Sequence, residues 1–193
     1  GRGIRIDRDI SELESAASQA EAEAEAAFGD GKLILERYVE NPRHVEVQVL
    51  GDKHGNVVHL FDRDCSVQRR HQKVVEEAPA PNLSKEQKEE MYSYSLQLAQ
   101  SMKYDSLGTV EFLVDVSTSE IFFLEMNTRL QVEHPVTEEI TGLDLVSLQI
   151  SSAAGDKLAI CQEDIKTKGS AIEVRVNAED PRHDFSPQSG SVW

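Results

Sequence analysis

Cysteine is scarce in this sequence, and its two cysteines form no cluster. Cys65 and Cys161 lie far apart with no CxxC or Cys/His grouping, which excludes a disulfide framework and a zinc site. The histidines show no mutual metal-ligand spacing either. No apolar run approaches the roughly 18 residues of a membrane span, and no charged-then-apolar leader is visible. We therefore expect no membrane partner and a reducing, intracellular location.

Positive charge is also in short supply. The chain has 20 Lys and Arg against 35 Asp and Glu, a formal net charge of -15. Binding along a nucleic-acid backbone needs a basic surface, so we expect no nucleic-acid partner. With 193 residues, of which 39% are hydrophobic and 28% charged, a folded globular protein remains.

The ends of the sequence read as interrupted segments. It begins with Gly1-Arg2-Gly3 and no initiating Met, a pattern typical of the tail of a glycine-containing loop. It ends at Trp193 shortly after a turn-like stretch. We expect the chain to be a piece of a longer protein.

Hydrophobic periodicity predicts an α+β fold with mainly antiparallel strands. Ser11 with Glu14, and Ser84 with Gln87, form patterns typical of helix capping boxes. The helices are expected over residues 11–28, 84–103 and 143–154, and the strands over 32–39, 44–49, 57–61, 109–115, 120–125 and 171–176. Residues 51–56 and 116–119 would form hairpin turns.

The most informative segment covers residues 125–135. If it is extended, Glu125 and Asn127 share a face, and continued extension adds Arg129, Gln131 and Glu133. Carboxylate and amide oxygens at that spacing suit magnesium, with Glu111 of the preceding strand as a second carboxylate. The alternative is that both acids are merely exposed on edge strands. Because the apolar run 121–124 indicates burial on both faces, we favour a partnered acid at its end.

A cationic island over residues 68–73 stands out in the acidic chain, and it contains Arg69, Arg70, His71 and Lys73. It could receive phosphate or carboxylate. A solvated loop neutralised by the neighbouring acids at 76 and 77 is an equally good interpretation. The residues thus predict a magnesium site plus anion-binding cations, which favours phosphoryl or carboxyl transfer without identifying the substrate.

Four motifs, at residues 63–73, 76–79, 125–135 and 178–181, resemble those of one family. They are similar to the biotin carboxylase component of biotin-dependent carboxylases, which has the ATP-grasp fold. The resemblance runs in order through nearly the whole chain. It implies that ATP phosphorylates bicarbonate to carboxyphosphate, whose carboxyl group passes to biotin on a carrier domain, and that a carboxyltransferase component uses the product.

The resemblance also implies roles for individual residues. The adenine hinge would be Glu36, Arg37, Tyr38 and Val39, with His44, Gln68 and His71 near the ribose and phosphates. Magnesium or manganese would be held by Glu111, Glu125 and Asn127. The bicarbonate and carboxyphosphate pocket would contain Lys73, Arg129, Gln131 and Val132, with Glu133 as general base and Arg175 as a cation near phosphate and biotin.

The resemblance covers only part of a catalytic unit. Residues 1–37 would end the ATP-grasp lid subdomain and residues 38–193 would begin the C-terminal subdomain, so we expect the piece alone to be inactive. Thr128 favours an acyl-CoA carboxylase of 3-methylcrotonyl- or propionyl-CoA type. The parent would be a homo-oligomer, mitochondrial if eukaryotic and cytoplasmic if bacterial. Alternatives are another bicarbonate-phosphorylating ATP-grasp ligase, such as a carbamoyl-phosphate synthetase, and a non-catalytic nucleotide-binding or assembly module.

Overall fold

The first of two units in the computed structural model is built around one helix. The structure describes residues 5–190, so the predicted lid-loop end at Gly1-Arg2-Gly3 lies outside the described part. The two units are Gly1–Glu40 and Asn41–Trp193. Helix α1 covers Leu13–Phe28. None of the helices in the described residues is both long and apolar enough to cross a bilayer.

The start of α1 differs from the prediction, whereas its end agrees. The capping box is wrong: Glu12 is the N-cap and makes no side-chain cap hydrogen bond. Ser11 instead donates from Oγ to Asp9, 2.7 Å away, because a short hydroxyl side chain readily bonds within its own turn. The helix ends at Gly29, whose φ of 71° is the left-handed conformation that glycine adopts easily.

The strand predicted over residues 32–39 is absent. These residues have no regular secondary structure, and Ile34 and Leu35 are 84% and 80% exposed. A strand needs a neighbour to satisfy its backbone N–H and C=O groups. The described residues of this unit contain no second strand that could provide one.

The second unit is a six-stranded antiparallel sheet with helices on both faces. Its elements are β1 (Pro42–Gly51), β2 (Val57–Arg69), β3 (Gln72–Ala78), α2 (Lys85–Ser101), β4 (Leu107–Asp115), β5 (Ile121–Asn127), α3 (His134–Thr141), α4 (Leu145–Ala154) and β6 (Ala171–Val174), followed by β7 (Glu179–Asp180) and β8 (Ser186–Pro187). The strand order is β5-β4-β1-β2-β3-β6. The α+β prediction and the two expected hairpins, β1–β2 and β4–β5, are confirmed. The short β7–β8 hairpin was not predicted.

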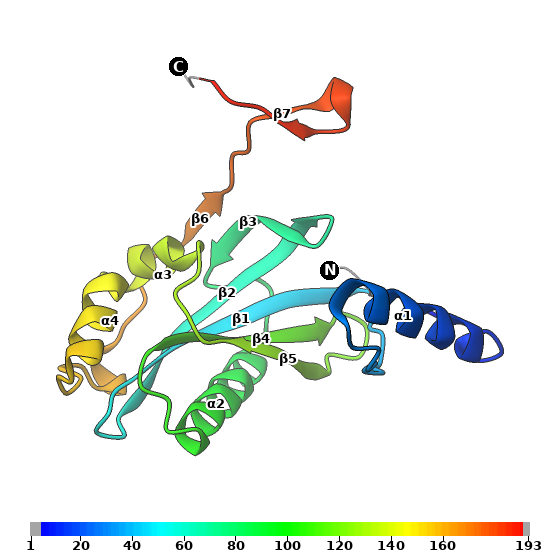
Figure 1. Cartoon of the computed structure of the whole chain (residues 1–193). Helices are drawn as coiled ribbons and strands as arrows, with labels where there is room; N and C mark the ends of the chain where they lie inside the picture. The colour runs from blue at the N-terminus through cyan, green and yellow to red at the C-terminus, as the bar shows by residue number, and fades with distance from the viewer. Residues whose placement is uncertain (1–4, 191–193) are drawn as a thin grey trace. The chain divides into compact units, whose positions relative to one another are not determined.

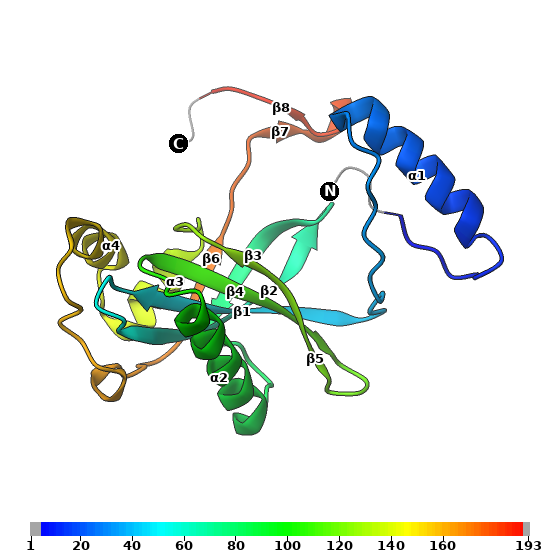
Figure 2. The same cartoon turned by 60° about the horizontal axis from the view of Figure 1, so that its bottom comes forward.

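Strand β1 divides its side chains between the two faces of the sheet. Val45, Val47 and Val49 pack with Met91 of α2 in one apolar cluster. The opposite face packs against α3 and α4, so the two helical layers lie on opposite sides (Figures 1 and 2). The capping box of α2 at Ser84 is confirmed. The side chains that alternate with these valines, among them Glu46 and Gln48, are fully buried on the opposite face of the sheet.

Strand β5 is not the doubly buried strand that its apolar run indicated. It forms one edge of the sheet, with Phe123 58% and Leu124 37% exposed. The edge-strand interpretation is thus right for Glu125, which is exposed. It is wrong for Glu111, which lies on the inner strand β4 and is 4% exposed.

The segment after β5 does not stay extended. The strand ends at Asn127, and α3, which was not predicted, begins directly after its N-cap Glu133. Pro135 in the first turn favours a helix start, because its missing N–H has no helical partner there. Gln131 and Glu133 are therefore positioned by a turn and a helix start instead of by strand alternation.

Candidate functional site

Four charged residues form a row across the α3 face of the sheet. Glu125 lies opposite Glu111, which lies opposite Glu46, which lies opposite Arg63, one on each of β5, β4, β1 and β2. Glu46 and Arg63 are fully buried. Burying charges is costly unless they are paired, so the row needs further partners.

Lys73 supplies the main positive partner. It extends from β3, and its Nζ lies 2.5 Å from Glu46 Oε2, 2.8 Å from Glu111 Oε1 and 2.7 Å from Glu133 Oε1. Three carboxylates from β1, β4 and the start of α3 thus converge on one ammonium group. Its three N–H donors are all used.

The cluster favours the ionised forms of Glu111 and Glu133. Burial alone raises the pKa of Glu111, but nearby His44 and the charge of Lys73 outweigh burial and hold that pKa well below its usual range. The pKa of Glu133 is lowered as well, since the hydrogen bond and charge of Lys73 overcome the effect of burial. Burial lowers the pKa of Lys73, but Glu46 and the other acids raise it above its ordinary value. At neutral pH the site therefore holds charged groups.

Arg175 provides a second cation to Glu133. It follows β6, and its Nη2 donates to Glu133 Oε2 at 2.9 Å while its Nε donates to Glu76 Oε1 at 2.7 Å. Glu76 is fully buried, and burial raises its pKa despite the opposing effect of Arg175. Glu133 is thus held between two cations, one on each carboxylate oxygen.

The predicted metal residues come together at the outer end of the row. Asn127 Nδ2 lies 3.0 Å from Glu111 Oε1 and 3.1 Å from Glu125 Oε1. Hard oxygen donors on a solvent-facing edge suit magnesium, which retains several waters. Glu111 is buried and also binds Lys73, whereas Glu125 is exposed on the edge strand. The donor set fits a divalent cation at this edge.

Two of the three residues predicted near ribose and phosphates join the cluster. His44 Nε2 lies 2.9 Å from Glu111 Oε2, and Gln68 Nε2 lies 3.2 Å from His44 Nδ1. His71 is exposed in the β2–β3 turn, where it and Arg70 have φ values of 63° and 52°. Positive φ at both residues is typical of tight hairpin turns.

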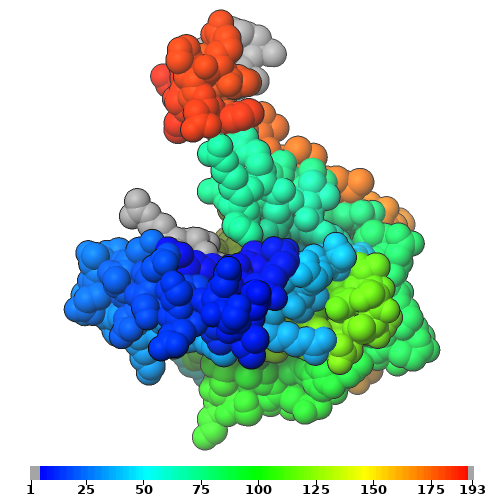
Figure 3. Space-filling model, turned by 90° about the vertical axis from the view of Figure 1, so that its right-hand side faces the viewer, coloured from blue at the N-terminus to red at the C-terminus, as the bar shows by residue number. Residues whose placement is uncertain are grey.

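The cationic island is not neutralised by the acids at 76 and 77. Arg69 makes two hydrogen bonds to Glu179, at 2.6 and 2.9 Å, and Arg70 pairs with Asp184 at 3.1 Å. The acid at 76 instead binds Arg175. The β2–β3 hairpin that carries Arg69 and Arg70 lies on the surface (Figure 3), and of the four cationic residues of the island only Lys73 contacts the buried cluster.

The remaining residues predicted for the bicarbonate pocket lie either in the buried cluster or at its exposed edge. Gln131 is 6% exposed, and its Nε2 donates to Glu111 at 2.9 Å. Arg129 is exposed, with Nη2 3.5 Å from Asn127 Oδ1. Val132 is 57% exposed. Their individual roles in binding bicarbonate stay predictions.

The predicted adenine-hinge residues belong to the first unit. Glu36, Arg37, Tyr38 and Val39 lie in its irregular segment after α1. The guanidinium of Arg8 lies 5.6 Å from the centre of the Tyr38 ring, a cation–π contact. Their contact with adenine stays a prediction.

Sequence reasoning missed Glu46, Glu76, Arg63 and Thr137. Strand alternation did place Glu46 on the polar face of β1, but a polar face gives no signal of burial. Arg63 lies in the motif at residues 63–73, yet that motif indicates no partner. Thr137 lies on α3, which was not predicted.

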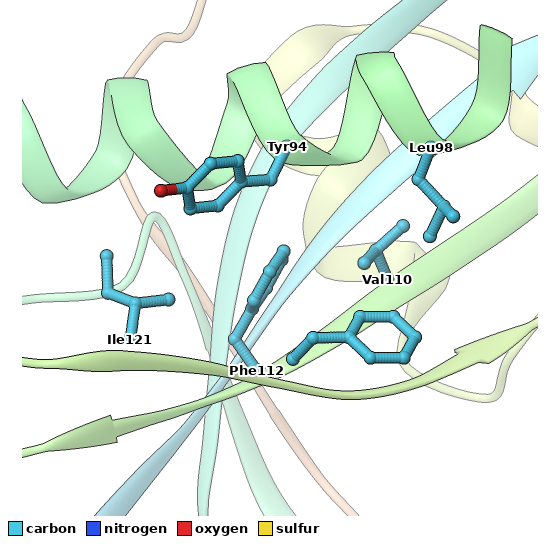
Figure 4. A pocket seen from close by; sticks show the side chains of 6 residues that line it. Tyr94, Leu98, Val110, Phe112 and Ile121 are labelled. Atoms are coloured by element: carbon cyan, nitrogen blue, oxygen red, sulfur yellow. The ribbon is translucent and has the colours of Figure 1, made fainter. Parts of the chain in front are cut away.

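A separate apolar pocket lies on the other face of the sheet. Between α2 and the β4–β5 edge it is lined by Tyr94, Leu98, Val110, Phe112, Ile121 and Phe123 (Figure 4). Figure 4 shows the Phe112 ring between the helix and the strands. The pocket contains none of the predicted site residues.

The antiparallel sheet, with one charged and helix-covered face, has the fold of part of an ATP-grasp domain, as the similarity to solved structures shows. The chain belongs to the family described as the carbamoyl-phosphate synthase L chain, ATP binding domain, which it matches over residues 1–161. Its similarity to biotin carboxylases, inferred from the motifs, is confirmed by the following comparisons.

Three known proteins illustrate this similarity. Pyruvate carboxylase 1 of Caenorhabditis elegans is 56% identical over 195 residues, covering 100% of this chain and 16% of that protein. The mitochondrial methylcrotonoyl-CoA carboxylase subunit alpha of Mus musculus is 51% identical, with 100% of this chain and 27% of that protein covered. The biotin carboxylase domain dimer of Hydrogenobacter thermophilus 2-oxoglutarate carboxylase, solved with MgADP, ADP and bicarbonate, has a TM-score of 0.88 and 54% identity over 96% of this chain and 41% of that one.

The chain thus spans well under half the length of these three proteins. Their final acceptors differ, and identities of 51–56% do not separate an acyl-CoA type from the pyruvate and 2-oxoglutarate types. The acyl-CoA preference indicated by Thr128 gains no support from these comparisons.

Proposed function

We propose that these residues form part of a biotin carboxylase, which uses ATP and bicarbonate to carboxylate biotin on a carrier domain. The observation that carries the proposal is the position of Glu133, held between Lys73 and Arg175 beside the predicted metal residues. Bicarbonate and the nucleotide phosphates are both anions, so their reaction needs cations to offset repulsion and a base to prepare the attacking oxygen. The cluster provides both.

Each group has a distinct task in this proposal. Glu133 is ionised and takes the bicarbonate proton, while Lys73 and Arg175 offset negative charge on the reacting groups. Gln131 and Arg129 orient bicarbonate from the cluster and its exposed edge, and Val132 completes the pocket. Glu111, Glu125 and Asn127 would hold magnesium or manganese, which neutralises phosphate charge when bound. Arg175 also stabilises the biotin enolate.

Nucleotide binding in the proposal uses the remaining predicted residues. Glu36, Arg37, Tyr38 and Val39 contact adenine, and His44, Gln68 and His71 approach ribose and phosphates. We assign residues 1–37 to the lid subdomain and 38–193 to the C-terminal subdomain. The boundary between the two observed units, after Glu40, lies close to this division.

The partners and location follow from the same proposal. The parent protein would dock a biotin carrier and a carboxyltransferase component and would form homo-oligomers; the H. thermophilus domain was solved as a dimer. We place it in the mitochondrial matrix of a eukaryote or the cytoplasm of a bacterium, and the two unpaired cysteines agree with a reducing compartment. The acyl-CoA acceptor type rests on Thr128 alone.

The test is phosphate release from ATP by the full-length parent, with bicarbonate, biotin and ammonia each supplied or omitted. Release that needs bicarbonate and increases with biotin supports the proposal. Release stimulated by ammonia, with carbamoyl phosphate formed, would identify a carbamoyl-phosphate synthetase. Nucleotide binding without any release would indicate an assembly module. Comparing 3-methylcrotonyl-CoA, propionyl-CoA and pyruvate as acceptors then tests the acceptor type.

A further inference from the structure

We propose that Arg63 is a positioning residue of this site, fixing Glu46 and Gln131 so that Lys73 and Glu111 keep their working geometry. The proposal rests on the proposed function. Arg63 lies beneath the cluster, and its five hydrogen bonds go to residues other than the predicted metal ligands. Its effect on the reaction would therefore pass through the side chains it holds.

The contacts of Arg63 use its full bonding capacity. Its side chain is fully buried. It donates from Nε to Glu46 at 2.6 Å, from Nη1 to Gln48 at 2.7 Å and Thr137 at 2.8 Å, and from Nη2 to Thr109 and Gln131, each at 3.3 Å. A guanidinium has five N–H donors in a rigid fork, so each donor has an acceptor.

Two short chains of hydrogen bonds lead from Arg63 to the proposed chemistry. Glu46 binds Arg63 through Oε1 and Lys73 through Oε2, so each of its oxygens has one cation. Gln131 accepts from Arg63 through Oε1 and donates from Nε2 to Glu111. One planar group therefore sets the orientation of both an acid and an amide within the cluster.

A β-bulge places Arg63 in this position. The β1–β2 register shifts between Val47 and Val49, and Phe61 on β2 adopts a φ of 64° there. Beyond the shift, Glu46 lies opposite Arg63. Bulges often re-aim a side chain beside a functional site, and here the bulge directs an arginine into a row of acids.

Lysine at this position would keep the charge but lose the fork. With three donors on a flexible stem it cannot serve five acceptors in one plane, so Glu46 and Gln131 would lose their fixed orientation. Arg43 offers a matched control on the same pair of strands. It makes a two-bond contact with Asp64 at 2.6 and 3.0 Å, and its side chain is 19% exposed.

The experiment compares Arg63→Lys with Arg43→Lys in the full-length parent. Thermal unfolding first establishes the folded fraction, and kcat and KM for bicarbonate and ATP are then measured. We expect Arg63→Lys to raise the bicarbonate KM or lower kcat by about tenfold or more, as loss of outer supporting groups commonly does. The ATP KM should change little, and Arg43→Lys should match the wild type in all three.

A second pair of variants covers the case in which Arg63→Lys does not fold. Thr137→Val removes one acceptor of Arg63 with little change in shape, and should shift the bicarbonate KM in the same direction. Thr141→Val is its control, since Thr141 lies on the same helix and its hydroxyl donates to the Thr137 carbonyl and accepts from the Leu143 N–H, without contacting Arg63.

Four results would overturn the proposal. Arg63 would be purely structural if the kcat and KM values of Arg63→Lys equalled those of Arg43→Lys. It would also be purely structural if Arg63→Lys lowered the amount of folded protein but left kcat and KM per folded molecule unchanged. Where Arg63→Lys does not fold, equal constants for Thr137→Val and Thr141→Val would do the same. A wild-type parent without bicarbonate-dependent ATP cleavage would remove the proposed function, and the role of Arg63 with it.

Discussion

Lys73 Nζ lies 2.7 Å from Glu133 Oε1, so the predicted bicarbonate-binding cation and the predicted general base are in direct contact. The two residues lie on β3 and at the start of α3, 60 positions apart in the sequence. This contact keeps Glu133 ionised, as a base requires, and it also makes Lys73 necessary for the stability of the buried acids.

Removing the ammonium group of Lys73 should destabilise the fold at neutral pH. In Lys73→Met, Glu111 and Glu133 lose their shared cation, and breaking a buried ion pair costs about 3 to 5 kcal/mol. Both acids have lowered pKa values in the native state. Their stabilising contribution is present above the unfolded pKa of about 4.3 and is lost as pH falls through the native values.

The free energy of unfolding that Lys73→Met loses relative to the wild type should therefore be larger at pH 7 than at pH 3, as measured by denaturant unfolding. The control is Lys85→Met, which removes a pair with Glu89 at 3.4 Å on the surface. Exposed pairs contribute at most about 1 kcal/mol, so it should change stability little. Equal deficits for the two variants would contradict the assigned role of Lys73.

The metal positions predict a shifted magnesium requirement. Glu111→Gln or Glu125→Gln should raise the magnesium concentration for half-maximal ATP cleavage and reduce the rate by roughly ten- to a thousandfold, about 1.4 to 4 kcal/mol. The assay is bicarbonate-dependent phosphate release by the full-length parent. Glu139→Gln, on the exposed side of α3, is the control. Wild-type kinetics in Glu125→Gln would remove it from the metal site.

The base assignment predicts a separation of binding from chemistry. Glu133→Gln should still bind ATP, because the hinge and metal residues are unchanged, but should lose biotin carboxylation because bicarbonate keeps its proton. Calorimetry and carboxylation assays measure the two properties. A variant with weakened ATP affinity and normal carboxylation at saturating ATP would contradict this role.

A buried histidine predicts how stability changes with pH. Burial lowers the pKa of His59 to about 4, and its ring stacks on Tyr92 with 4.1 Å between ring centres. The native pKa lies below the unfolded value of about 6.5, so stability is fully present above that value and falls as pH drops toward 4. The loss should be about 3 kcal/mol.

Unfolding measured between pH 7 and pH 4 checks this. His59→Phe keeps an aromatic ring for the Tyr92 stack, and its stability should fall by less than that of the wild type. Replacing the exposed His54 with Gln should leave the pH dependence of stability the same as in the wild type. An unchanged profile in His59→Phe would show that His59 is not the responsible group.

The 193 residues alone should turn over poorly. They cover only 16–41% of the three proteins compared, so groups that act on charge in the transition state are expected from other parts of the parent. Weak magnesium-dependent nucleotide binding, measured by calorimetry, is the most we expect. Biotin-dependent phosphate release as fast as that of the full-length parent would contradict this.

Local signals in the sequence were sufficient for much of the fold. The alternation in β1, the turn between β1 and β2, and the capping box at Ser84 each specify an element through interactions between near neighbours. They failed for residues 32–39, where a strand-like pattern has no partner strand among the described residues of its unit. They also missed α3, which is only 8 residues long.

The sequence by itself determined which residues carry charge and, through its motifs, the family. Only the tertiary structure decided which of them are buried together. If the register next to the β1–β2 turn continued along both strands, Glu46 would lie opposite Asp62. The bulge shifts the register by one residue, so that Glu46 lies opposite Arg63. Lys73, Glu111 and Glu133 likewise come from separate elements. Their contacts depend on register and on helix packing over the sheet, which no local pattern encodes.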